Sequence, residues 1–153
     1  MTAMQIFERC KAAESDKKAL RDKIKRYRDS ATRMSAALDG VGARSTSEPD
    51  KLSAIMAEID YLEREIRQRD REYAVEVAAA CKLLDMLPEV ECKIVNSFYI
   101  AGTPLTVIAR ELSFSYGYTR TVKCGACAHL DAIPEAMVAA LLPPWYLNAN
   151  SNE

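Results

Sequence analysis

The sequence predicts an all-α protein in which a long antiparallel helical hairpin precedes a small C-terminal unit of short helices. Two segments, 4–38 and 51–87, carry apolar residues at helical spacing and contain neither glycine nor proline. A segment rich in turn-forming residues, 39–50, separates them. From Pro88 onwards the apolar clusters are short and are divided by Gly, Pro and Ser, which favours several short helices. Residues 132–153 are expected to add one further short helix and a tail.

The first predicted helix, 4–38, has an apolar or small residue every three or four positions, with Lys17 as the one interruption. A stripe with this spacing is typical of a helix that packs against another helix along its length. The stripe consists of Ile6, Cys10, Ala13, Leu20, Ile24, Tyr27, Ala31, Met34 and Leu38.

The second predicted helix, 51–87, would be roughly 55 Å long at 1.5 Å per residue. Its stripe shifts frame after Tyr73, and up to that point it consists of Leu52, Ile55, Ile59, Leu62, Ile66, Arg69 and Tyr73. Residues 1–49 hold eleven Lys/Arg against seven Asp/Glu, whereas residues 50–87 hold six against nine, so the two helices attract each other. The pattern predicts an antiparallel coiled coil within one chain, and pairing of the same stripes between chains would give a homodimer.

The segment 88–131 predicts three short helices. Gly102 suits the left-handed conformation that ends the first of them, Thr103 suits an N-cap, and Pro104 suits the first position of the next helix. Ser115 is expected to cap the third helix, so that a turn of about three residues joins the second and third helices, as in a helix-turn-helix.

Composition and charge exclude several classes of protein. No apolar run is long enough for a membrane helix, and the first residues lack the features of a signal peptide, so a cytoplasmic protein without a membrane partner is expected. Five cysteines without an export signal are expected to be reduced thiols. A net charge of −1 argues against a general nucleic-acid binder.

The stretch from Leu87 to Tyr118 resembles region four of bacterial sigma factors, and especially the small sigma-region-four-like regulators encoded by phages and mobile elements. The features that match are the leading Leu87-Pro88, the apolar pattern ending in Phe98-Tyr99-Ile100, Gly102 before the second helix, the pair Ile108-Ala109 with Leu112, and Ser115 before a helix whose inward positions recur at 119, 122, 126 and 130. The Glu- and Arg-rich stretch 61–67 is similar to the long helical region that many of these regulators carry.

The resemblance implies a DNA-binding transcription regulator whose third helix enters the major groove of double-stranded DNA. The residues implied to face DNA are Tyr116, Gly117, Tyr118, Arg120, Thr121 and Lys123, with Cys124 beside them. Arg120 is the expected base reader, because its guanidinium can address guanine O6 and N7 together. Lys123 is expected to contact phosphate. The helical hairpin is expected to contact RNA polymerase.

Other functions fit some of the same sequence features. A coiled-coil assembly or adaptor protein, similar to small terminase subunits or to a sigma-mimicking polymerase binder, is the alternative. The basic run from Lys17 to Arg28 could bind DNA phosphates, although such charges usually form the solvated face of a coiled coil. Cys124, Cys127 and His129 could bind zinc, but Cys127 is expected to be a packed residue. No catalytic residue, metal or cofactor is therefore predicted.

Overall fold

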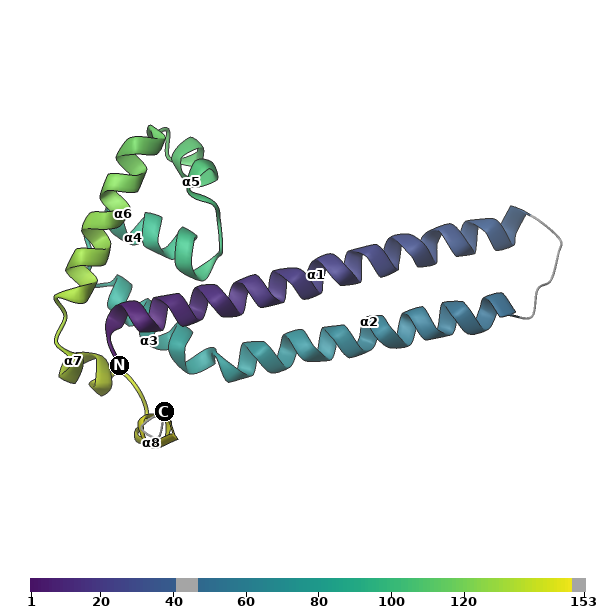
Figure 1. Cartoon of the computed structure of the whole chain (residues 1–153), viewed down its shortest axis with the longest axis horizontal. Helices are drawn as coiled ribbons and strands as arrows, with labels where there is room; N and C mark the ends of the chain where they lie inside the picture. The colour runs from purple at the N-terminus through teal and green to yellow at the C-terminus, as the bar shows by residue number, and fades with distance from the viewer. Residues whose placement is uncertain (41–46, 150–153) are drawn as a thin grey trace. The chain divides into compact units, whose positions relative to one another are not determined.

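The computed structural model describes residues 1–40 and 47–149, and within these ranges the regular structure is helical, without strands (Figure 1). The all-α prediction is confirmed. None of these helices combines the length and the apolar character of a membrane span. The helices are α1 (Ala3–Gly40), α2 (Ser47–Glu72), α3 (Ala74–Leu84), α4 (Glu89–Val95), the π-helical turn η1 (Asn96–Ile100), α5 (Leu105–Glu111), α6 (Tyr116–Asp131), α7 (Glu135–Ala140) and α8 (Pro144–Ala149).

The chain forms two compact units. Unit 1 consists of residues 1–15 and 72–153, and unit 2 consists of residues 16–71. The sequence-based division differs, because it groups residues 1–87 as one hairpin. The first part of α1 belongs to unit 1 because Ile6 and Phe7 are fully buried in the core of that unit.

The second long helix is shorter than predicted. Instead of one helix over 51–87, the structure has α2 and α3, separated at Tyr73, whose φ of −98° and ψ of 5° depart from helical values. The change coincides with the frame shift in the apolar stripe. Before Tyr73 the stripe faces α1 in unit 2, whereas Ala79, Ala80 and Leu83 lie in the core of unit 1. The segments before and after Tyr73 therefore pack into two different cores.

Unit 2 is held by a narrow apolar seam between α1 and α2. Ile24, Ile59 and Leu62 are buried in it. Ion pairs flank the seam, among them Lys17 with Asp70 at 2.7 Å, Arg28 with Glu63 at 2.7 Å and Lys23 with Glu58 at 3.7 Å. Lys17, which interrupts the predicted stripe, is therefore paired across the seam. The side chain of Leu38, also predicted in the stripe, lies outside the described residues.

Unit 1 contains the larger core, to which α1, α3, α4, η1, α6, α7 and α8 all contribute. Its buried residues are Ala3, Ile6, Phe7, Cys10, Ala79, Ala80, Leu83, Leu84, Val95, Tyr99, Ala126, Leu130, Val138, Leu142 and Tyr146. Burial raises the pKa of the Cys10 thiol to about 12, so this cysteine is held as an inert thiol.

A carboxylate is buried within this core. Glu76 is 1% exposed, accepts a hydrogen bond from the Tyr146 hydroxyl and lies 3.2 Å from the Arg9 guanidinium. Burial and the hydrogen bond to this carboxylate raise the pKa of the Tyr146 phenol. Glu76 therefore links three helices, α1, α3 and α8, by polar contacts inside an apolar core.

The C-terminal end differs in part from the predicted tail. Pro134 precedes the short helix α7, as expected, but Trp145, Tyr146 and Leu147 then form another helix, α8. Tyr146 is buried, whereas Trp145 is 64% exposed. Residues 150–153 of the predicted tail lie outside the described part of the chain.

Candidate nucleic-acid interface

Helix α6 is positioned by the short segment that joins it to α5. The amide of Phe114 donates to the Ala109 carbonyl at 2.8 Å, and this hydrogen bond wraps the chain around the end of α5. Ser113 adopts a left-handed φ of 58° at this turn, a conformation that glycine adopts more readily than serine. The turn thus holds α6 close to α5 at the cost of backbone strain.

The strain at Ser113 predicts a stabilising substitution. Ser113→Gly is expected to raise the free energy of unfolding by about 0.5–1 kcal/mol, because glycine adopts a positive φ without a steric penalty. Thermal and denaturant unfolding would measure the change. The control is Arg110→Gly, which places a glycine in the helical backbone of α5 and is expected to destabilise the protein by about 1 kcal/mol. A Ser113→Gly protein that is less stable than the parent would show that the serine side chain has a stabilising role.

The preceding turn departs from the prediction by one residue. Gly102 does adopt a left-handed φ of 67°. The N-cap of α5, however, is Pro104 rather than Thr103, because the Pro104 carbonyl accepts from the amide of Ile108 at 3.1 Å. The Thr103 amide donates back to Ser97 at 2.8 Å and so belongs to the turn that closes η1.

The N-terminus and inward face of α6 agree with the sequence analysis. Ser115 is the N-cap, and its Oγ accepts from the Tyr118 amide at 3.1 Å. Thr119, Ala126 and Leu130 are buried, and Val122 is half-buried. The Thr119 hydroxyl donates to the Ser115 carbonyl at 3.0 Å, which satisfies the polar group on this buried face.

The first turns of α6 expose the residues predicted to face DNA. Tyr116 and Tyr118 are each 51% exposed, and Gly117, Arg120 and Thr121 are also exposed. The Tyr118 ring packs edge-on against Phe114, with 5.0 Å between the ring centroids, and the Thr121 hydroxyl donates to the Gly117 carbonyl at 3.0 Å. These contacts hold the side chains of Tyr118 and Thr121 in place, and the side chain of Arg120 is exposed.

Lys123 lies differently from the other predicted contacts. It is half-buried, and its Nζ lies 4.5 Å from the centroid of the Phe98 ring. Position 123 follows Thr119 by four residues, so it lies beside the buried face of α6 rather than opposite it. Lys123 thus faces a groove in unit 1 of about 410 Å³. The groove is lined by Glu8, Lys11, Ala12, Ser15, Phe98, Tyr99 and Lys123.

The residues weighed as zinc ligands have other neighbours. The Cys127 sulfur lies 3.6 Å from the Tyr99 hydroxyl, and Cys124 is exposed. His129 Nδ1 lies 2.7 Å from a Glu91 oxygen, a partner that the sequence analysis missed because 38 positions separate the two residues. Among residues 1–40 and 47–149, no group of three or more His, Cys, Asp or Glu is arranged to hold a metal ion.

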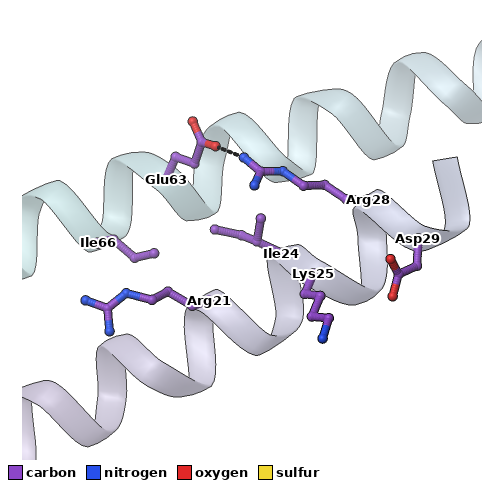
Figure 2. A pocket seen from close by; sticks show the side chains of 7 residues that line it. All are labelled: Arg21, Ile24, Lys25, Arg28, Asp29, Glu63 and Ile66. Carbon is purple, nitrogen blue, oxygen red and sulfur yellow. Dashed lines mark hydrogen bonds and ion pairs between the residues drawn. The ribbon is translucent and has the colours of Figure 1, made fainter. Parts of the chain in front are cut away.

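The basic run of α1 lies on unit 2. There Arg21, Lys25 and Arg28 line a groove of about 470 Å³ with Ile24 and Ile66 (Figure 2). Figure 2 shows the Arg28 guanidinium bonded to Glu63 of α2, so this cation is partly neutralised. Asp29 also lines the groove. The basic run is therefore less positive than its sequence indicates.

Comparison of the chain with protein-family models, with curated proteins and with solved structures finds no match. The feature with the most defined geometry is α6, which is capped at Ser115, packed through Thr119 and exposed at Arg120.

Proposed function

We propose that this protein is a DNA-binding transcription regulator of phage or mobile-element type, which recognises promoter DNA in the manner of sigma factor region four. The observation that carries the proposal is the exposed first half of α6. There, Tyr116, Arg120 and Thr121 are exposed, whereas Thr119 and Ala126 are buried. In this proposal α5 and α6 are the helix-turn-helix, and the start of α6 enters the major groove.

Unit 2 is proposed to be an antiparallel coiled-coil hairpin that contacts RNA polymerase. The ion pairs along its seam support the coiled coil, because they join α1 to α2 at positions flanking buried isoleucine and leucine. Residues 88–153 hold only four Lys/Arg, against six Asp/Glu. Phosphate contacts by this segment alone would be few, so tight binding requires polymerase, a second copy of the chain, or the basic run of α1.

The proposal is tested by selecting bound duplexes from a random DNA pool, with and without polymerase. On the selected site, Arg120→Ala is expected to weaken binding by about 1–3 kcal/mol and to relax preference at one base pair, because a bidentate contact to guanine is lost. Arg67→Ala, which removes an exposed arginine from α2, is the matched control and should leave base preference unchanged. Binding titrations on the selected and mismatched duplexes measure both effects.

The alternative is an assembly or adaptor protein in which the coiled coil is the functional interface. The excess of acidic residues in 88–153 favours it, since acidic surfaces repel DNA. The same selection separates the two functions. Absence of duplex binding at low salt, even with polymerase present, would refute DNA recognition. Enrichment of duplexes that Arg120→Ala binds with unchanged preference would show that another surface reads the DNA.

A further inference from the structure

Two lysines from distant parts of the sequence converge on one aromatic ring in unit 1. The Nζ of Lys11, on α1, lies 3.5 Å from the centroid of the Phe98 ring, and the Nζ of Lys123, on α6, lies 4.5 Å from it. The two ammonium groups are therefore within about 8 Å of each other. They flank the groove that Phe98 and Tyr99 line.

No carboxylate neutralises this pair in the described part of the chain. Neither Lys11 nor Lys123 forms an ion pair there, although Glu8 lines the same groove. Burial and the neighbouring charge of Lys123 lower the pKa of Lys11. Holding two like charges close together in a half-buried position is unfavourable unless an anion binds between them.

We propose that Lys11 and Lys123 form a binding site for a phosphate group. An ammonium donates charge-assisted hydrogen bonds of about 2.7–2.9 Å to phosphate oxygens, and a tetrahedral phosphate can accept from two lysines at once. Phosphate is favoured over a carboxylate because its several oxygens can meet donors arriving from two helices. The Phe98 ring, whose centroid lies 3.5 Å from Lys11 Nζ and 4.5 Å from Lys123 Nζ, lines the groove beside the two ammonium groups.

The phosphate has two possible sources, the DNA backbone or a free phosphate compound. Lys123 follows Arg120 by three residues, so the site lies about one turn further along α6 from the proposed base contact. Assignment of the site to a backbone phosphate rests on the proposed function. The site itself does not, because it is built from the two lysines and Phe98 alone.

The site is tested first without DNA, by titrating the full chain with inorganic phosphate and comparing it with chloride at equal ionic strength. Phosphate, but not chloride, is expected to shift the NMR signals of Lys11, Phe98 and Lys123. It should also raise the pKa of Lys11, because a bound anion stabilises the charged form. The pKa is followed through the lysine side-chain resonances. The signals of Glu8 and Tyr99, which line the same groove, are recorded in the same spectra as a check on the assignment.

Variants then assign the binding to the two lysines. Lys11→Gln and Lys123→Gln are each expected to weaken phosphate binding about tenfold. Lys11→Arg should retain it, since the charge and donors remain, and this variant keeps the test valid if a glutamine variant folds poorly. The matched control is Lys93→Gln, which removes the same charge from α4, where Lys93 is paired with Glu89. It should bind phosphate like the parent.

The DNA arm asks whether the two lysines share a single phosphate. If the two lysines share one phosphate, the double glutamine variant should reduce the slope of log affinity against log salt on the selected duplex by about one, whereas lysines on two separate phosphates would reduce it by about two. Phosphate binding without any duplex binding would retain the site, assign it to a free phosphate compound and refute DNA recognition. Equal responses to phosphate and chloride, or a Lys93→Gln effect as large as that of Lys11→Gln, would overturn the site.

Discussion

Replacement of Glu76 by alanine is expected to lower the free energy of unfolding by about 3 kcal/mol. The change removes the acceptor of the Tyr146 hydroxyl and the partner of Arg9, and it leaves a space in the core of unit 1. Removal of one member of a buried polar cluster leaves the others without their hydrogen bonds. Denaturant unfolding measures the loss.

Two variants distinguish the loss of the buried Glu76 cluster from the loss of a negative charge anywhere in the protein. Tyr146→Phe removes only one hydrogen bond and should cost about 1–2 kcal/mol. Glu89→Ala removes an exposed carboxylate whose ion pair with Lys93 lies on the surface, and it should leave the free energy of unfolding nearly unchanged. If Glu76→Ala were as stable as Glu89→Ala, the buried cluster would contribute nothing.

Ile59→Asp is expected to unfold unit 2, because a carboxylate without a partner would enter the small apolar seam that Ile24, Ile59 and Leu62 form in the described part of this unit. The expected loss in the free energy of unfolding, about 4 kcal/mol or more, is larger than the stability that so small a core contributes. Unit 1 has its own core and should keep its structure. Hydrogen exchange measured peptide by peptide should show fast exchange in residues 16–71 and continued protection in α3 and α6.

Tyr61→Asp is the matched control, since Tyr61 lies two residues further along α2 and is 52% exposed. It introduces the same charge at the surface and should leave the exchange of unit 2 unchanged. Simultaneous loss of protection in both units of Ile59→Asp would show that they fold as one cooperative body. Unchanged protection would show that the buried seam does not hold α1 and α2 together.

The helical spacing of apolar residues in the sequence predicts most of the helices in the fold. The stripe that includes Ile24, Ile59 and Leu62 correctly predicted which faces of α1 and α2 are buried, because helical spacing places such residues on one side. The break at Tyr73 was not predicted, since no proline or glycine marks it. It depends on which core each part of the helix joins, and that is a property of tertiary packing.

The sequence predicted only part of the candidate site. Local chemistry identified Ser115 as the N-cap, because a cap depends only on neighbouring residues. The surroundings of Lys123 could not be predicted in this way. They are set by Lys11 and Phe98, which lie far away in the sequence, and only the packing of α1 and η1 against α6 brings the three residues together.

The division of α1 between the units has a consequence for the order in which the protein folds during synthesis. Unit 2 is contiguous, so α1 and α2 can pair as soon as residue 71 has left the ribosome. Ile6 and Phe7, by contrast, are made before unit 2 but wait for partners such as Tyr99 and Leu130 until the later helices of unit 1 have been synthesised. Early closure of unit 2 brings residues 15 and 72 together and shortens the search for those partners.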